Sequence, residues 1–411
     1  MSSGAATARD DAAELVIRLG RALHAFGTSS HRLEAALERV SRHLGLEGQF
    51  FSTPTAIFAS FGGGAKSETV LVRAEPGGMD LARLQEVEGL LSDLLAGRCE
   101  PRQVSARLDQ VIAGPPRYGP VLTTLAFGLA SGSAARFFGA GPREIAAAAL
   151  VGLGIGLLGL LVAGRSNLSR LFEPLSACFA ALFAGFAATW LAPFAGSIDA
   201  ATVVLAGLIV LFPGLTLTLA MSELAARHLV SGSARLAGAV ITFLGIGFGV
   251  AVGQHAAHAL FGPAPAGAPL PLPGWTEAPA LLGTALAFVV LFRARGRDLP
   301  WILLGALVAL FGGRLGTELL GSELAAFVGA FLLGAVANTF RRALDRPAAV
   351  VQVPGMMLLV PGSLGFRSIS SLLAQDPTAG IQAAFSMTLV AVSLVMGLLM
   401  ATVLFAPRRL L

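Results

Sequence analysis

Two apolar stretches decide how this chain is built: VVLAGLIVLFPG at residues 203–214 and VQVPGMMLLVPG at residues 351–362. They align at an offset of 148 residues, and each ends in a Pro-Gly pair followed by small and hydroxyl-bearing residues. Proline removes a backbone donor and clashes with the preceding helical turn, while glycine tolerates an unwound conformation. Each pair therefore predicts a break inside an apolar helix, at matched places in an internal repeat.

Charge is unevenly distributed around these two stretches. Residues 1–118 carry 13 Lys or Arg and 14 Asp or Glu, whereas residues 119–411 carry 16 Arg, no Lys and 10 acids. A water-soluble protein of this size would need more than 13% charged residues to cover its surface when 55% of the chain is hydrophobic. We therefore expect water around the first part and lipid around the second.

The apolar part divides into ten stretches, each near the roughly 20 residues that cross a bilayer core. The predicted spans are residues 121–138, 145–162, 171–192, 200–220, 236–260, 276–292, 299–315, 324–340, 348–373 and 379–405. The predicted fold is thus an all-α polytopic membrane protein of about ten transmembrane helices, with the lipid bilayer as its partner.

Loop charges orient these spans. With residues 1–118 in the cytoplasm, the inner loops gather arginines, whereas the outer loops carry acids and a Pro-rich stretch, 263–276, without Lys or Arg. Positive charge collects on the cytoplasmic side of membrane proteins, so both termini are predicted to be cytoplasmic. Arg143 and Arg314 run against this bias.

The repeat is predicted to be inverted, because its first Pro-Gly pair lies in span four and its second in span nine. Five spans separate them, so the copies, residues 119–262 and 277–411, cross the bilayer in opposite directions. Helices broken at corresponding places mark the binding site in such repeats. The N-terminus of each half-helix carries partial positive charge and favours an anionic ligand such as a carboxylate.

Polar and ionisable side chains near the breaks are the candidate transport residues, because ionisable groups at membrane depth are costly. The predicted substrate-binding residues are Pro213, Gly214, Thr216, Thr218, Ser222, Glu223, Arg227, Pro361, Gly362, Ser363, Arg367 and Ser370. The alternative for Glu223 and Arg227 is an i,i+4 ion pair that marks where span four leaves the lipid.

Residues 1–118 are predicted to form a small α+β cytoplasmic domain. Helical periodicity covers residues 14–46, interrupted at Gly27, and returns at 80–96 and 101–112. Between them, residues 49–74 are rich in aromatic and β-branched side chains around Gly62-Gly63-Gly64, which suggests a hairpin.

The sequence lacks the motifs of several other classes of protein. The charges form no single basic patch, so no nucleic acid is expected as a partner. Cys99 and Cys178 are too few for a disulfide framework or a cysteine metal site. We find no GxSxG, HExxH or P-loop motif, so no catalytic residues, cofactor or metal are predicted and the protein is not expected to be an enzyme.

Three parts of the chain resemble the bacterial threonine/serine exporter family in its fused two-part form. Residues 19–34 and 51–55 resemble the N-terminal domain of that family, residues 213–236 resemble its best-marked membrane segment, and residues 347–373 are similar to its C-terminal half. The resemblance implies a ten-span inner-membrane exporter of threonine and serine, driven by the proton-motive force. The family pattern after the first Pro-Gly has an amide and a base where this chain has Leu219 and Ser222.

Three other interpretations stay open at the level of sequence. Split relatives of the family are associated with dicarboxylate export, so the cargo could be succinate-like instead. The soluble domain could serve a membrane sensor or scaffold, and a passive channel would also fit the spans. Glu223 is the candidate ammonium partner or proton carrier, Arg367 could hold a second carboxylate, and homo-oligomer formation is left open.

Overall fold

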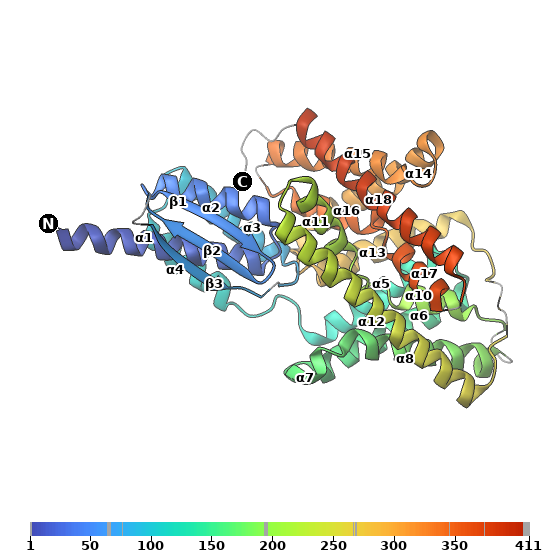
Figure 1. The fold of residues 1–411 in the computed structure, drawn as a ribbon. Helices are drawn as coiled ribbons and strands as arrows, with labels where there is room; N and C mark the ends of the chain where they lie inside the picture. Colours follow the sequence, from blue (N-terminus) through green and yellow to red (C-terminus); the bar gives the residue numbers. More distant parts are fainter. Residues whose placement is uncertain are drawn as a thin grey trace.

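The computed structural model describes residues 2–63, 67–75, 77–192, 196–265, 267, 269–344, 346–373 and 375–405. Figure 1 shows a small α+β domain at the N-terminal end, drawn in blue, beside a larger all-helical body. The predicted fold class is thus confirmed in its coarse form: a mostly helical chain preceded by a small sheet.

The N-terminal domain combines four helices with one three-stranded sheet. In chain order its elements are α1 (Ser2–Ala25), α2 (Ser30–His43), β1 (Gly48–Thr53), β2 (Ala56–Phe61), β3 (Glu68–Arg73), α3 (Leu81–Leu95) and α4 (Pro101–Ala113). The strands lie in the order β1-β2-β3 and pair antiparallel, so they form two successive hairpins. Gly27 ends the first helical stretch with a φ of 92°, as its sequence position predicted. Gly64 of the predicted hairpin turn lies outside the described residues.

Strand alternation decides which face of this sheet packs on the helices. Ile57, Ala59 and Phe61 are buried on one face of β2, while Phe58 between them is exposed. The buried face joins the apolar faces of α1, α2 and α3 in one cluster, which continues into helices α13, α14 and α16 of the membrane part. The domain is therefore packed against the second half of the membrane part.

The membrane part is entirely helical in the described residues. Its helices are α5 (Pro120–Phe137), α6 (Pro142–Val162), α7 (Ser166–Ser169), α8 (Phe172–Phe186) continued by the π-helix η2 (Ala187–Leu191), α10 (Ala200–Gly207), α11 (Gly214–Ala225), α12 (Leu229–Phe261), η3 (Gly274–Thr276), α13 (Glu277–Leu291), η4 (Gly296–Asp298), α14 (Leu299–Leu320), α15 (Ala325–Leu344), α16 (Ala349–Leu359), α17 (Gly362–Leu373) and α18 (Pro377–Leu404).

Seven helical segments in the described residues are long and apolar enough to cross a membrane. Their outward side chains are apolar, and Ile241 and Phe248 of α12 are 69% and 67% exposed. Such exposure suits lipid but not water. Helices overlie all ten predicted stretches, yet a count of ten spans and the side on which each terminus lies stay predictions.

The chain breaks helices at both Pro-Gly pairs. Helix α10 ends at Gly207 and α11 begins at Gly214, with Pro213 as its N-cap at φ −76° and ψ 40°. Helix α16 ends at Leu359 and α17 begins at Gly362. Pro354, by contrast, lies inside α16 without ending it. Because Pro354 is followed by Gly355, a Pro-Gly pair alone does not break a helix, and the two breaks lie at the pairs that end the matched stretches.

The two halves of the membrane part pack in matching ways. Helix α11 packs on α12 and reaches across to α18, while α17 packs on α18 and reaches across to α12. Between the halves, α5 and α13 pack side by side and run in opposite directions. Tyr118, just before α5, donates to the carbonyl of Ala294 just after α13, and Arg136 near the end of α5 donates to Thr276 just before α13.

Candidate substrate cavity and domain contacts

The two helix breaks meet in space. A Cβ atom placed on Gly214 would lie 2.0 Å from Cγ1 of Val360 and 3.8 Å from Cα of Gly362. A Cβ atom on Gly362 would lie 3.1 Å from Cβ of Phe212. Segments 148 residues apart in sequence therefore touch, and glycine permits the approach. The first turns of α11 and α17, whose N–H groups lack partners within their own helices, begin at this contact.

A cavity of about 690 Å³ adjoins this contact. Its lining comes from α5, α13 and α14, from both breaks, and from Gly78, Met79 and Pro116 of the N-terminal part, so both halves of the membrane part contribute to it. Along α13 it extends from Glu277 to Leu291, about 21 Å at 1.5 Å per residue, and it continues to Arg293 just beyond the helix. Arg293 lies beside the N-terminal domain, where it forms an ion pair with Asp80 at 3.6 Å, so Glu277 marks the distal end.

Most of the cavity wall is apolar, with hydroxyl groups at a few positions. Thr123, Thr284 and Ser363 line it, among side chains such as Phe127 and Leu215. The hydroxyl groups of Thr123 and Thr284 donate to carbonyls of their own helices, at 3.1 Å and 3.0 Å. Each keeps a lone pair that can accept a hydrogen bond from a ligand. A few polar groups on an apolar wall are typical of a small-molecule site.

Charged side chains gather at the distal end of the cavity. Glu277 forms an ion pair with Arg314 of α14 at 2.5 Å and a longer one with Arg136 of α5 at 3.8 Å. Arg136 also donates to Thr276 at 2.6 Å and to the carbonyl of Pro273 at 3.3 Å. Arg314 was one of the two arginines that ran against the charge bias in the sequence.

The structure brings only part of the predicted residue set to the cavity. Gly214, Gly362 and Ser363 line it. Thr218 is buried and bonds back to the carbonyl of Gly214 at 3.1 Å, whereas Arg367 is exposed on α17. The cavity lining does not include the other predicted residues of the described chain: Pro213, Thr216, Ser222, Glu223, Arg227, Pro361 and Ser370.

Glu223 instead joins the membrane part to the N-terminal domain. Its side chain is fully buried and accepts hydrogen bonds from the backbone N–H of Ser30 at 2.9 Å and the hydroxyl of Ser231 at 2.7 Å. Nε of Arg235 donates to both carboxylate oxygens, at 3.0 Å and 3.2 Å. We call this the Glu223 contact. Arg227 lies in the turn beyond the end of α11, with a φ of 65°.

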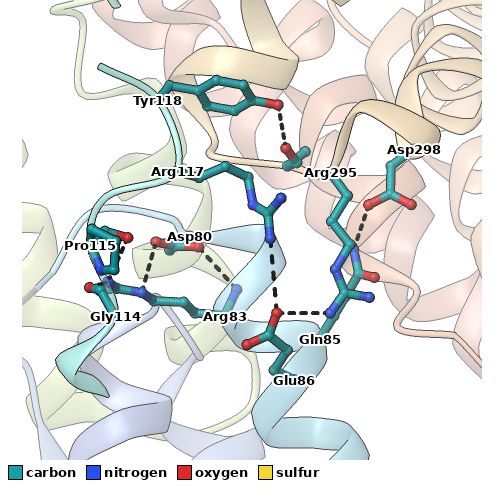
Figure 2. Close-up of polar contacts among 11 residues, drawn as sticks. Asp80, Arg83, Gln85, Glu86, Gly114, Pro115, Arg117, Tyr118, Arg295 and Asp298 are labelled. Carbon is teal, nitrogen blue, oxygen red and sulfur yellow. Dashed lines mark hydrogen bonds and ion pairs between the residues drawn. The ribbon is translucent and has the colours of Figure 1, made fainter. Parts of the chain in front are cut away.

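A second contact joins the domain to the other half of the membrane part (Figure 2). Gln85 of α3 donates to Asp298 at 2.8 Å, and both side chains are buried. Glu86 pairs with Arg295 at 3.0 Å and with Arg117 at 4.0 Å. We call this the Asp298 contact. The domain therefore bridges the two halves on one side of the molecule, as Figure 1 also shows.

Burial shifts the pKa of several groups beside the Glu223 contact. Desolvation, helped by the charge of Arg32, lowers the pKa of His31 to about 4, and His31 lies against His228 with ring centroids 6.0 Å apart. Desolvation also lowers the pKa of His24 and raises that of Glu34. The imidazole of His31 is therefore neutral near pH 7 in the docked domain.

Sequence reasoning missed the ion pair of Glu277 and Arg314, and it missed the docking role of Glu223. Two partners of Glu223, Ser231 and Arg235, lie nearby on α12, but Ser30 lies 193 residues away in the N-terminal domain, so no local pattern connects Glu223 to that domain. The sequence did point to Arg314, because this arginine runs against the predicted bias of positive charge toward the cytoplasmic side. Among the described residues, no group of three or more His, Cys, Asp or Glu could hold a metal ion.

Comparison with known proteins identifies relatives by name. Pheromone-regulated membrane protein 10 of Debaryomyces hansenii is 28% identical over 410 residues, covering 91% of this chain and 37% of that protein. The proteins of the same name in Eremothecium gossypii and Saccharomyces cerevisiae are 28% and 27% identical, and the chain covers 50% and 47% of their lengths. The chain thus spans half or less of these relatives. No solved structure matches it.

These relatives support a multi-pass membrane protein, but as yeast proteins they do not support the bacterial inner membrane that the resemblance implied. Residues 14–256 match a family model described as a threonine/serine exporter. Residues 280–404 match a second model, described as Threonine/Serine exporter, ThrE. Together the matches cover the N-terminal domain, both helix breaks and the cavity helices. The chain belongs to the threonine/serine exporter family.

Proposed function

We propose that this protein exports small hydroxy amino acids, threonine and serine, through the cavity between its two broken helices. The observation that carries the proposal is the meeting of the α11 and α17 N-termini, at Gly214 and Gly362, beside that cavity. Helix N-termini attract carboxylates through their free N–H groups and their dipoles. The substrate carboxylate would bind there, with the hydroxyl of Ser363 close by.

The size and wall of the cavity suit such a substrate. A volume of about 690 Å³ is ample for an amino acid of fewer than ten heavy atoms together with water. The hydroxyls of Thr123 and Thr284 on the opposite helices can accept hydrogen bonds from an ammonium or hydroxyl group. We therefore propose Thr123 and Thr284 as binding residues instead of Thr216, Thr218, Ser222 and Arg367.

We propose further that the two halves are inverted repeats that alternate access to the cavity. The antiparallel packing of α5 on α13 supports this arrangement, as does the matched crossing of α11 on α18 and α17 on α12. In such transporters one half rocks against the other around a fixed central site. The protein would be a secondary exporter that uses the proton gradient, with its N-terminal domain on the cytoplasmic side.

Efflux from proteoliposomes tests this proposal. Vesicles holding the purified chain are loaded with labelled threonine, serine or succinate, a proton gradient is imposed across their membrane, and efflux is followed with and without a protonophore. Threonine and serine efflux that slows when the proton gradient collapses is the expected result. Succinate efflux alone would change the cargo to a dicarboxylate, and efflux insensitive to the protonophore would indicate a passive channel. If none of the three leaves the vesicles, the proposed function is wrong.

A further inference from the structure

The distal end of the cavity is closed by charges from both halves of the membrane part. Glu277 starts α13, and its carboxylate lies 2.5 Å from Nη2 of Arg314 and 3.8 Å from Nη2 of Arg136. Glu277 and Arg314 both line the cavity, with side chains 28% and 50% exposed. Both charges therefore face the space through which a substrate would leave.

Stability does not explain why these charged side chains lie at the distal end of the cavity. Arginine on the outer side of a span opposes the charge bias that orients membrane proteins, and an ion pair with this much exposure contributes little to stability. Such groups are retained for function more often than for stability. Arg136 has a separate structural role, because it holds Thr276 and the carbonyl of Pro273. Glu277 and Arg314 are left to face the cavity.

We infer that Glu277 and Arg314 form an exit subsite for zwitterionic amino acids. When the Glu277–Arg314 ion pair opens, the amino acid binds to both side chains. The inference rests on the proposed function and adds to it a second site with a defined selectivity. A zwitterion carries one ammonium and one carboxylate a few ångströms apart. Its ammonium replaces the guanidinium of Arg314 beside Glu277, and its carboxylate replaces Glu277 beside Arg314.

This exchange distinguishes amino acids from dicarboxylates. A dicarboxylate can bind Arg314, but its second carboxylate then meets the like charge of Glu277, which is left with its longer ion pair to Arg136 at 3.8 Å. An amino acid leaves neither Glu277 nor Arg314 unpaired when it opens the ion pair. The exit subsite therefore selects the zwitterionic cargo, which the helix N-termini alone would not do, since they attract any carboxylate.

The path from the central site to the exit subsite lies along α13. Thr284 follows Glu277 by seven residues, two helical turns, so both side chains lie on one face of the helix, about 10 Å apart along its axis. A substrate that leaves the two breaks thus passes the hydroxyl of Thr284 before it reaches the Glu277–Arg314 pair.

Binding of two matched ligands to the purified full chain tests the inference. Threonine and 3-hydroxybutyrate share the carboxylate and the hydroxyl group, and only threonine has the ammonium. Apparent affinities are measured by the ligand-induced rise in the thermal unfolding midpoint. The wild-type protein should prefer threonine, and Glu277→Gln should lower that preference about tenfold, as expected when one charge-assisted bond is lost. Arg314→Gln should weaken the binding of both ligands.

Glu318→Gln is the matched control, since Glu318 is an exposed carboxylate one turn beyond Arg314 on α14. It should leave the preference unchanged. If Glu277→Gln fails to fold because Arg314 is left unpaired, the double variant Glu277→Gln/Arg314→Gln removes both charges and should lose the preference for threonine as well.

The outcomes separate this inference from the proposed function. If Glu277→Gln, or the double variant in its place, keeps the wild-type preference for threonine, the exit subsite is refuted while threonine export stands. If the wild-type protein neither binds nor exports threonine, the proposed function is refuted and the exit subsite with it. A preference that falls only when the Glu277–Arg314 pair is altered supports the inference.

Discussion

The two broken helices are alike at the break and differ at the far end. Both half-helices begin at the glycine of a Pro-Gly pair, run for 12 residues and pack on α12 and α18. Nine residues after its first glycine, α11 carries Glu223, which is buried against the N-terminal domain. The corresponding residue of α17 is Ser371, a half-buried serine.

The N-terminal domain thus contacts the two halves of the membrane part through different side chains. The N-terminal domain holds the first half through the Glu223 contact and the second half through the Asp298 contact. If the halves rock against each other, both contacts cannot remain unchanged. We therefore expect the domain to favour one state of the cavity, and the following predictions compare its two contacts and the two breaks.

The largest effect is expected at Glu223. Glu223→Gln removes a buried charge and leaves Arg235, which is 12% exposed, without its carboxylate. Breaking a buried pair in this way costs about 3 kcal/mol. Because Arg235 lies on α12, the loss falls on the packing of α11 against α12 and, through the bond to the Ser30 amide, on the docking of the domain. Hydrogen exchange at the Ser30 amide, which donates to Glu223, reports the loss as faster exchange. Ser371→Ala is the control at the matched position, and an equal effect there would contradict the comparison.

The next effect separates the two breaks. A Cβ at Gly214 would lie 2.0 Å from Val360, whereas one at Gly362 would lie 3.1 Å from Phe212. Gly214→Ala should therefore lower stability by about 2 kcal/mol, as overpacking does, and Gly362→Ala by less. Thermal unfolding in detergent measures both variants.

Val360→Ala supplies the control for the two glycine variants. It removes the Cγ1 atom that the new Cβ would strike, so adding it to Gly214→Ala should restore part of the lost stability. Equal destabilisation by the two single glycine variants, without rescue, would show that the breaks do not touch as described.

A pH-dependent effect is expected at the Glu223 contact. The pKa of His31 is lowered to about 4 when the domain is docked, and the free imidazole titrates near 6.5. As pH falls below 6.5, the undocked form binds a proton that the docked form does not, so docking weakens by about 1.4 kcal/mol per pH unit until about pH 4. Glu34 opposes this trend, because its raised pKa favours protonation in the docked form.

Hydrogen exchange of α2 between pH 7 and pH 5 measures the effect of His31, after correction for intrinsic rates. His31→Gln should remove most of the pH dependence. If the variant and the wild-type protein show the same dependence, another group controls docking.

The smallest effect is expected at the Asp298 contact. Gln85→Ala leaves one oxygen of the buried Asp298 without its donor, while the ion pair of Asp298 with Arg346 at 3.8 Å remains. Such a loss costs about 1 kcal/mol. Hydrogen exchange in the first turn of α3 should rise slightly, with Arg102→Ala on the exposed face of α4 as control. A larger effect than that of Glu223→Gln would reverse the ranking of the two contacts.

Much of the fold could be predicted from sequence because it is determined locally. Helix periodicity, capping glycines and strand alternation located the N-terminal elements, and the Pro-Gly pairs located both breaks. The first helix, however, begins at Ser2 rather than at residue 14, and residues 49–74 hold three strands rather than one hairpin. These local patterns do not predict contacts between residues that are distant in the sequence. Glu223 was assigned to the substrate because it follows a break, yet it bonds to Ser231 and Arg235 of α12 and to Ser30 of the N-terminal domain.

The candidate site was predicted only at the breaks themselves. Gly214, Gly362 and Ser363 line the cavity, as their positions suggested, whereas most of the wall comes from α5, α13 and α14, with Gly78 and Met79 of the N-terminal domain. Glu277 and Arg314 are 37 residues apart, and their pairing depends on how α13 packs against α14. Sequence alone marked Arg314 as an arginine near a span end that runs against the charge bias, and gave it no partner.

The most direct test of the account is whether substrate occupies the space between the two breaks. Ser363→Cys in a Cys99→Ser/Cys178→Ser background places a single thiol on the cavity wall, since the chain has only two cysteines. A thiol reagent should block threonine efflux from proteoliposomes, and threonine present during labelling should slow the modification. Labelling that neither blocks efflux nor responds to threonine would contradict a transport site at the breaks.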